Sequence, residues 1–342
     1  MALLDPGPYL RGVAFAAIAR DAGMADGDNP IPYPRQDPAD FSRLPIDTWA
    51  AAQLPVGVRL EWTCADPVTV HYRTRTDDLG YRGNGAGRTF TVWNGEELIA
   101  EEPAVLGEGR VIVGGRPEGT TVVHLPEGMQ PWIVDLDGPP ELVPGPSGPR
   151  WLCYGDSIAE GWIAGSPAYS WPAITGRRHR LDTINLGFAG SARGETVSAE
   201  HLARLEGDVI SLSHGTNCWN RIPHSAAQMR ANTDAFLSIV RSAHPTTPIL
   251  VVSPIVRPDA EAQPNALRAT HADLRDAMED AVRAHIAAGD GELHLLGGHD
   301  LLTTEMLGDG VHPNDEGHRR LADRIGPVIA ALVEPQPTKG IV

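Results

Sequence analysis

The chain has 342 residues, which is enough for two domains of ordinary size, and its 42% hydrophobic and 21% charged residues are typical of globular proteins. It carries 28 basic against 44 acidic residues, a formal net charge of −16. This excess of negative charge argues against binding to nucleic acids or to an anionic membrane surface. We therefore expect neither a nucleic acid nor a membrane as a partner.

The cysteine content and the N-terminal region bear on location and on bound metals. The three cysteines are an odd number and lack the spacing of a metal site, so we expect no disulfide framework, no metal and no cofactor. The apolar stretch 12–19 follows no basic segment and falls far short of the ~20 residues of a membrane span, so neither a cleaved signal nor a span is expected. These features favour a cytoplasmic location.

The first 55 residues are rich in proline and aspartate, and they show no periodic pattern that would assign an element. Between residues 57 and 136, short segments alternate between apolar and polar positions and are rich in Val, Thr, Trp and Tyr. This pattern is typical of antiparallel strands in a β-sandwich. The predicted strands are VRLEWTC (58–64), VTVHYRT (68–74), RTFTVWN (88–94), RVIVGG (110–115), TTVVHLP (120–126) and PWIVDL (131–136).

A stretch rich in proline and glycine, 138–149, is the expected domain boundary. We predict an N-terminal β-sandwich domain at 1–145, a catalytic domain at 146–334 and a tail at 335–342. For the sandwich we consider a role in carbohydrate binding or in shaping the substrate site.

After residue 150 the pattern changes to apolar strands that alternate with longer helical segments. Runs of consecutive apolar residues suit strands buried on both faces of a parallel sheet. A helix over 225–243 should bury Met229, Phe236 and Val240, and the closing helix should be kinked or restarted at Pro327. The sequence therefore predicts a doubly wound α/β sheet of five strands. The strands are WLCYG (151–155), DTINLG (182–187), DVISLSHG (208–215), PILVVSP (248–254) and ELHLLG (292–297).

Unusual polar residues follow the carboxyl ends of these strands, where ligands bind in such sheets. A serine hydroxyl is a weak nucleophile and requires an adjacent base, so Ser157 is the candidate nucleophile and His312 the candidate general base. Asp309 can accept a hydrogen bond from the other imidazole nitrogen and stabilise the imidazolium. An oxyanion formed by attack on a carbonyl needs donors. The backbone N–H groups of Ser157 and Gly190 and the side-chain amide of Asn217 are the candidates.

This ordered set resembles the four sequence blocks of the SGNH (GDSL) hydrolases. The blocks are Gly-Asp-Ser at 155–157, a glycine in the segment after the second strand, Gly-Thr-Asn at 215–217, and Asp-x-x-His at 309–312. The resemblance implies a flavodoxin-like SGNH fold, a catalytic triad of Ser157, His312 and Asp309, and an oxyanion hole that includes Gly190. Gly187 is the alternative for the glycine role.

The sequence departs from the family pattern at two positions. Ile158 stands where the family has Leu, which changes only a packing residue. Cys218 stands where the family has an Asp that braces the loop, so the hydrogen bonding of this loop is in doubt. Cys218 lacks a base, and we do not expect it to be a nucleophile.

Other residues near these blocks have a structural reading and a functional one. His214 is expected to be a structural histidine with its hydrogen bonds satisfied, and a contact to the substrate is the alternative. Asp156 is expected to cap a helix. Four aromatic side chains are either core residues or walls of a substrate pocket: Trp162, Tyr169, Trp171 and Trp219.

Three functions are compatible with this reading. The first is a serine esterase that cleaves a short acyl group from a polar or glycosidic small molecule. The second is an O-acyltransferase that uses the same acyl-enzyme and moves an acyl group from a thioester to the hydroxyl of a natural product. The third is a binding protein with a vestigial catalytic domain, against which the intact triad residues argue. The expected partners are a small-molecule ester or acyl thioester and, for a transferase, an alcohol acceptor.

Overall fold

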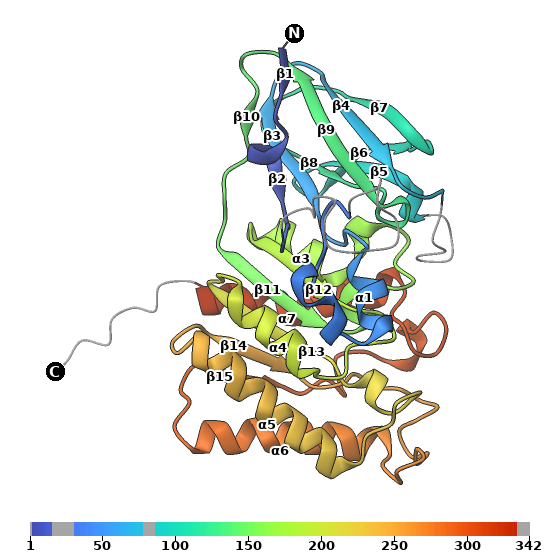
Figure 1. The fold of residues 1–342 in the computed structure, drawn as a ribbon, viewed down its shortest axis with the longest axis vertical. Helices are drawn as coiled ribbons and strands as arrows, with labels where there is room; N and C mark the ends of the chain where they lie inside the picture. The colour runs from blue at the N-terminus through green and yellow to red at the C-terminus, as the bar shows by residue number, and fades with distance from the viewer. Residues whose placement is uncertain (1, 16–30, 78–85, 334–342) are drawn as a thin grey trace, which may run out of the picture.

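The computed structural model describes residues 2–15, 31–77 and 86–333, and the tail predicted at 335–342 lies outside them. Within this part of the chain, two antiparallel sheets precede a parallel sheet with helices on both faces (Figure 1). The fold class predicted from the sequence is therefore confirmed. The division at residue 145 stays a prediction, although none of the three sheets joins strands from both sides of it.

The antiparallel sheets pack on each other around one apolar core. Leu60 and Phe90 of one sheet and Val70 and Ile133 of the other are fully buried in this core. The first sheet has the order β1 (Ala2–Leu4), β9 (Pro131–Gly138), β4 (Val68–Thr74), β7 (Gly107–Val113). The second has the order β10 (Val143–Pro144), β3 (Arg59–Cys64), β8 (Arg116–His124), β5 (Thr89–Asn94), β6 (Glu97–Pro103), and β2 (Leu10–Arg11) also pairs with β3.

All six strands predicted before residue 137 are present. The sequence did not reveal β6, because most of its side chains are at least partly exposed and its residues do not alternate. It also did not reveal the two- and three-residue strands β1, β2 and β10.

The parallel sheet has the order β12 (Asp182–Gly187), β11 (Arg150–Gly155), β13 (Val209–Ser213), β14 (Ile249–Val252), β15 (Leu293–Leu296). This 2-1-3-4-5 order is the flavodoxin-like arrangement. One expectation needs correction: β15 is not buried on both faces. It lies at the edge of the sheet, and three of its four residues are only partly buried.

Alternation along β11 directs side chains to the two faces of this sheet. Leu152 and Tyr154 pack toward α4 (Thr196–Arg204), α5 (Ala226–Ala243) and α6 (His271–Ala287). Trp151 and Cys153 pack toward α3 (Trp171–His179) and α7 (Asp315–Val333). The buried face predicted for the helix at 225–243 is confirmed, since Met229, Phe236 and Val240 are all buried in α5.

The closing helix differs from the prediction in one respect. α7 continues without a break through Pro327, so the helix is not restarted there. Pro327 and Asp323, one turn earlier, are both exposed. Water can therefore satisfy the Asp323 carbonyl that loses its intrahelical hydrogen bond to the proline.

The segment before residue 55, which the sequence left unassigned, supplies β1 and β2 to the antiparallel sheets, and its residues 31–52 also contact the parallel-sheet half. It contains a 3-10 helix (Pro38–Arg43) and α1 (Ile46–Ala52). Trp49 and Ile31 belong to the same buried cluster as Phe188, which follows β12. The remaining short helices are Gly7–Tyr9, Ala86–Arg88, Glu127–Met129, Ser157–Glu160 (α2), Pro167–Tyr169, Thr216–Cys218 and Thr304–Met306.

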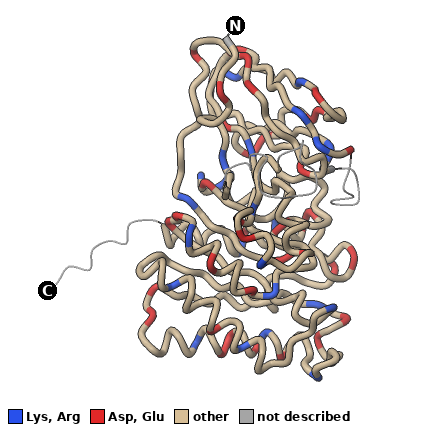
Figure 2. Tube along the Cα trace, in the orientation of Figure 1, with Lys and Arg blue, Asp and Glu red and all other residues tan. Residues whose placement is uncertain are grey.

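Basic and acidic residues are interspersed along both halves of the molecule (Figure 2). None of the helices in the described ranges is both long and apolar enough to cross a membrane. Residues 16–19 of the apolar stretch considered above lie outside the described residues.

Candidate active site

The register of the parallel sheet brings three of the predicted segments to one edge. Gly155, the last residue of β11, pairs with Gly187 of β12 on one side and with Ser213 of β13 on the other. The loops that continue from these residues therefore leave the sheet side by side, at its carboxyl edge. These loops carry Ser157, Gly190 and Asn217.

Ser157 is the first residue of the short helix α2, directly after β11. Asp156 is the N-cap of this helix, and its carboxylate accepts a hydrogen bond of 3.0 Å from the backbone N–H of Ile158. The capping role expected for Asp156 is confirmed. Because the cap fixes the first turn, the Ser157 side chain is held at the sheet edge on a rigid element.

The side chains of Ser157, His312 and Asp309 form one hydrogen-bonded chain. The Ser157 Oγ lies 2.9 Å from the His312 Nε2, and the His312 Nδ1 lies 2.7 Å from the Asp309 Oδ2. A neutral imidazole with its proton on Nδ1 satisfies both contacts: it donates to the Asp309 carboxylate and accepts from the serine hydroxyl. The structure thus brings together the three residues predicted as a triad.

Asp309 also holds the backbone of the loop that presents His312. Its Oδ1 accepts hydrogen bonds from the N–H groups of Val311, at 3.0 Å, and His312, at 2.7 Å. Burial raises the pKa of the Asp309 carboxyl, but the hydrogen bonds from the His312 side chain and from the two N–H groups outweigh it and lower the pKa overall. The carboxylate therefore stays ionised beside the imidazole.

The two glycines considered for the oxyanion hole differ sharply in their surroundings. The Gly187 N–H already donates to the Asn185 Oδ1 at 2.8 Å, and a Cβ at Gly187 would lie 2.3 Å from the backbone nitrogen of Glu160. Gly190 is exposed and has a φ of +71°. A Cβ at this position would meet no atom within 4 Å apart from its chain neighbours. Within the described residues, the N–H groups of Gly190 and Ser157 have no hydrogen-bond partner. These contacts favour Gly190 over Gly187.

Asn217 lies in the 3-10 helix that follows β13. Its Nδ2 is 3.4 Å from the carbonyl oxygen of Ala192, in the loop that also contains Gly190. The buried Asp156 carboxylate accepts hydrogen bonds from the N–H groups of both Ile158 and Thr216, so it ties α2 to the Asn217 segment. The three candidate donor segments are thus connected to one another.

Cys218 does not replace the missing aspartate as a polar brace. Its side chain is fully buried in the apolar cluster beneath the site, and its Sγ lies 3.8 Å from the Arg193 carbonyl oxygen. Burial raises the pKa of the Cys218 thiol well above its usual value, which disfavours a nucleophilic thiolate. The loop is held instead by the Cys218 N–H, which donates to the Gly215 carbonyl, and by contacts from Asn217 and Asp156.

Sequence reasoning missed a buried ion pair beneath the glycine loop. The guanidinium of Arg35 pairs with the Glu160 carboxylate at 3.2 Å, and both side chains are almost completely buried. Arg35 also donates to the Gly187 carbonyl, while Glu160 accepts from the Ala189 N–H at 2.9 Å. This pair therefore holds both ends of the turn that leads to Gly190. Arg35 comes from the unassigned N-terminal segment, which shows no pattern that could have revealed it.

The N-terminal segment also supports Gly190 indirectly, through Arg193. Arg193 donates to the Gly190 carbonyl at 2.9 Å and to the Asp47 carboxylate of α1 at 2.5 Å. Arg35 and Asp47, both from the segment before residue 55, thus support the loop with the candidate oxyanion glycine, Asp47 through Arg193.

His214 is a structural residue, but its hydrogen bonds are not all satisfied as expected. Its ring is buried against Tyr154 and Phe236, and its Nδ1 has no partner within the described part of the chain. Burial, followed by the charge of His224, lowers the pKa of His214 to about 4. The imidazole is therefore neutral at physiological pH.

Of the four aromatic side chains considered for a substrate pocket, only Trp162 contacts the triad. Its ring centroid lies 6.1 Å from that of His312, and it packs on Leu54 and Val56. Trp171 is buried in the core. Tyr169 packs edge-on against Trp93, and the Trp219 Nε1 donates to the Gln263 carbonyl.

The buried Asp156 should leave a measurable trace in the pH dependence of stability. Burial raises its pKa from 3.8 to about 6, against hydrogen bonds from Ile158 and Thr216 that lower it. Between these two values the folded state holds a proton that the unfolded state has released, so this group's contribution to stability falls as pH rises. We expect the free energy of unfolding of the wild type, relative to Asp156→Asn, to fall by up to about 3 kcal/mol across this window.

Urea unfolding at a series of pH values measures this difference. Asp66→Asn, at an exposed aspartate, is the matched control and should follow the wild type. Identical pH profiles for the wild type and Asp156→Asn would contradict the assignment.

Comparison with known proteins agrees with this geometry. The sequence model of the GDSL-like lipase/acylhydrolase family matches residues 150–330. A search of curated protein sequences finds no match.

Solved structures of similar fold extend the likeness to the antiparallel sheets. The chain is similar to the salicylyl-acyltransferase SsfX3 from a tetracycline biosynthetic pathway, with 26% identity, 94% of each chain covered and a TM-score of 0.78. It is also similar to a structure named as a GDSL-like lipase from Bacteroides ovatus, with 20% identity, 98% of each chain covered and a TM-score of 0.77. A family two carbohydrate esterase from Clostridium thermocellum matches with 16% identity, 80% of this chain and 91% of that chain covered, and a TM-score of 0.58.

The family match covers more than half of the 342 residues and includes each of the four blocks that form the site. The chain belongs to the GDSL-like lipase/acylhydrolase family and is an enzyme of the SGNH type.

Proposed function

We propose that this enzyme cleaves carboxylic esters through an acyl-enzyme on Ser157. The observation that carries the proposal is the hydrogen-bonded chain from Ser157 through His312 to Asp309, with contacts of 2.9 and 2.7 Å. This geometry meets the requirement that a serine nucleophile and its base lie within hydrogen-bond reach, with the base oriented by a third group.

In the first half-reaction, the Ser157 Oγ attacks the carbonyl carbon of the ester while His312 Nε2 takes the hydroxyl proton. The imidazolium that forms is stabilised by the Asp309 carboxylate. As the tetrahedral intermediate collapses, the bond to the leaving alcohol breaks and His312 returns the proton to that oxygen. The acyl group stays on Ser157 until water, activated by the same histidine, releases it as a carboxylic acid.

The oxyanion of the tetrahedral intermediate needs preorganised donors. The N–H groups of Ser157 and Gly190 are the two backbone candidates, and the second amide hydrogen of Asn217 is the third. Arg35, Glu160 and Arg193 act through the glycine loop as positioning residues, because they bond to its backbone rather than to the substrate.

The proposed substrate is a short acyl ester of a polar or glycosidic small molecule. Trp162 beside His312 is the proposed wall of the acyl site. The order of antiparallel sheets followed by a catalytic sheet, which this fold shares with carbohydrate esterases, supports a polar alcohol as the leaving group.

A second candidate is an O-acyltransferase, in which a bound alcohol takes the acyl group in place of water. The similarity to SsfX3 over 94% of both chains, antiparallel sheets included, favours it. The two candidates share every step up to the acyl-enzyme.

The esterase and the transferase differ in whether the acyl group passes to water or to an alcohol. The enzyme is given p-nitrophenyl acetate or an acetyl thioester of N-acetylcysteamine, with and without a panel of sugar and polyphenol alcohols, and the products are identified by mass spectrometry. Free acid at a rate unaffected by any alcohol supports the esterase, and an O-acylated alcohol in excess of acid supports the transferase. If neither donor is turned over, both candidate functions are contradicted, and a binding protein with a vestigial catalytic site is the remaining candidate.

The proposed role of Asn217 predicts a specific kinetic effect. Asn217→Ala is expected to lower kcat by about 10²- to 10³-fold, the cost of one oxyanion donor, with little change in the unfolding midpoint. Asn220→Ala, at an exposed asparagine three residues later, is the matched control and should retain wild-type activity. A loss of less than threefold for Asn217→Ala would mean that its amide serves only the loop.

A further inference from the structure

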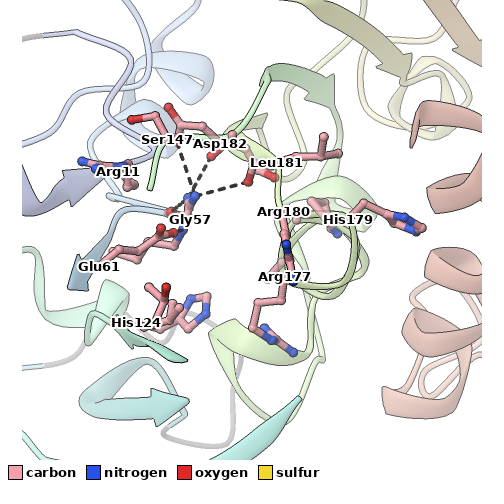
Figure 3. Close-up of a pocket in the computed structure, with 18 of the residues that line it drawn as sticks. Arg11, Gly57, Glu61, His124, Ser147, Arg177, His179, Arg180, Leu181 and Asp182 are labelled. Atoms are coloured by element: carbon pink, nitrogen blue, oxygen red, sulfur yellow. Dashed lines mark hydrogen bonds and ion pairs between the residues drawn. The ribbon is translucent and has the colours of Figure 1, made fainter. Parts of the chain in front are cut away.

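A cavity of about 670 Å³ lies between the antiparallel sheets and the parallel-sheet half. Figure 3 shows Arg11, Glu61 and His124 on one side of it, and Arg177 and Arg180 on the other. Its volume falls in the range of ~300–1,000 Å³ that is usual for small-molecule sites. Both halves of the molecule contribute to its wall, so it exists only in the complete fold.

This cavity is separate from the candidate active site. Along β12 its wall runs from Asp182 to Asn185 and does not include Gly187, the residue at the catalytic edge. Ser157, Asp309 and His312 do not line the cavity.

The charge of the cavity wall is opposite to that of the chain. The lining contains four arginines and only two acidic residues, Glu61 and Asp182, while the whole chain carries 28 basic against 44 acidic residues. Arg59 pairs with both of these carboxylates, at 2.6 Å and 3.4 Å. Among the described residues, no ion pair joins a carboxylate to any of the other three arginines: Arg11, Arg177 and Arg180.

Arg177 and Arg11 each have a donor left over, although the Arg11 guanidinium also donates to the carbonyls of Pro8, Leu10 and Gly145. Arg177 stacks over the Trp93 ring at 4.2 Å and donates from Nη1 to the Ala168 carbonyl at 2.7 Å. The buried Nε atoms of Arg177 and Arg11 have no partner within the described ranges, and neither has the buried Thr183 hydroxyl on the same wall. Buried donors without acceptors are costly, so an acceptor-bearing ligand would stabilise this arrangement.

Burial of a guanidinium is also costly, and the charge of Glu96 offsets this cost only in part for Arg177. Burial lowers the pKa of Arg177 to about 10. An anion beside this group would relieve the cost, because it would supply the opposite charge and the missing acceptors together.

We propose that this cavity binds a small organic anion that carries a carboxylate or a phosphate group, held by Arg177 and Arg180 at the end of α3 and by Arg11 on the opposite wall. Guanidinium groups match the geometry of both anions through paired N–H donors. The site does not depend on the proposed acyl transfer, because none of the three triad residues lines it.

Calorimetric titration of the full chain tests the proposal, with inorganic phosphate and citrate as probes and sorbitol as the neutral control, all at fixed ionic strength. We expect saturable binding of phosphate, citrate or both below ~10 mM, and none of sorbitol. Binding of only one probe identifies which anion the site prefers. Ser157→Ala should bind with unchanged affinity, which separates the cavity from the catalytic edge.

Variants on one helix provide matched controls. Arg180→Gln and Arg177→Gln are each expected to raise the Kd by about tenfold or more, the cost of a charged hydrogen-bonding partner. Arg178→Gln should leave it unchanged, because Arg178 is not part of the cavity wall and already pairs with Glu96 and Asp323.

Arg177→Gln also removes the stacking on Trp93, so its unfolding midpoint is measured alongside. Arg180 is exposed and its replacement is not expected to affect folding. Absence of saturable binding by both anions, equal weakening by Arg178→Gln and Arg180→Gln, or loss of binding in Ser157→Ala would each overturn the proposal.

Discussion

Replacement of Ser157 by alanine is expected to lower kcat by about 10⁴- to 10⁶-fold, because the variant has no nucleophile to accept the acyl group. The oxyanion donors and the binding surface would remain and account for the residual rate. Folding should be preserved, since the capping contact from Asp156 goes to the Ile158 N–H and not to the serine hydroxyl. Stopped-flow or plate-based hydrolysis of p-nitrophenyl acetate, with the unfolding midpoint measured in parallel, gives the result.

Ser213→Ala is the matched control for this variant. Ser213 pairs with Gly155 at the same edge of the sheet, and its hydroxyl contacts only the Tyr154 carbonyl among the described residues. It should keep most of the activity. A Ser157→Ala enzyme with wild-type turnover would show that another group carries the chemistry.

Replacement of His312 by alanine is expected to cost about as much as the loss of Ser157, because the triad acts as a unit. Within the described residues, the His312 Nε2 is the only hydrogen-bond partner of the Ser157 Oγ, so its loss removes the base. The double variant Ser157→Ala/His312→Ala should therefore be no slower than either single variant. If the two residues contributed independently, the double variant would instead show the product of the two losses in kcat.

Asp309→Asn is expected to be less damaging than His312→Ala, by about tenfold to a hundredfold in kcat. Asp309 transfers no proton itself, and the amide oxygen of the asparagine can still accept the hydrogen bond from the His312 Nδ1. The kinetic comparison of the three single variants and the double variant in one assay measures these ratios. Additive losses of kcat in the double variant, or a larger loss of kcat for Asp309→Asn than for His312→Ala, would contradict the claim that the three residues act as a unit.

The residues at the strand ends were predictable because each belongs to a local pattern. A strand that is buried on both faces can be recognised in the sequence as a run of apolar residues. In a parallel sheet, the residues that follow such strands all lie at the carboxyl edge of the sheet. Ser157 comes two residues after the end of such a strand, and Asn217 comes four residues after the end of another. His312 was predictable from its spacing to Asp309, which lets the carboxylate bond to both the ring and the backbone of the same residue.

The support of the glycine loop could not be predicted in the same way. Arg35 is 1% exposed and pairs with Glu160, 125 residues later, but a buried ion pair has no sequence periodicity. Arg35 lies outside any helix or strand, and the packing of neighbouring residues such as Trp49 and Ile31 against the parallel-sheet half brings it there. Long-range polar contacts of this kind depend on tertiary structure alone.

The contacts that hold the loop around Cys218 also could not be predicted from the sequence. The sequence showed that an aspartate was missing, but not what would replace its contacts. In the structure, the loop is held by backbone hydrogen bonds and by the Asp156 carboxylate, and the cysteine joins the apolar core instead. Strand β6 was missed for a related reason: an exposed edge strand has no buried face to impose alternation.

The most direct test of the central claim is to find the atom that carries the acyl group. The wild type and Ser157→Ala are treated with a fluorophosphonate and, separately, with an acetyl thioester under acid quench, and the peptides are sequenced by mass spectrometry. We predict an adduct on Ser157 from both reagents, and none in Ser157→Ala. An adduct on Cys218, or labelling that survives in Ser157→Ala, would contradict the account.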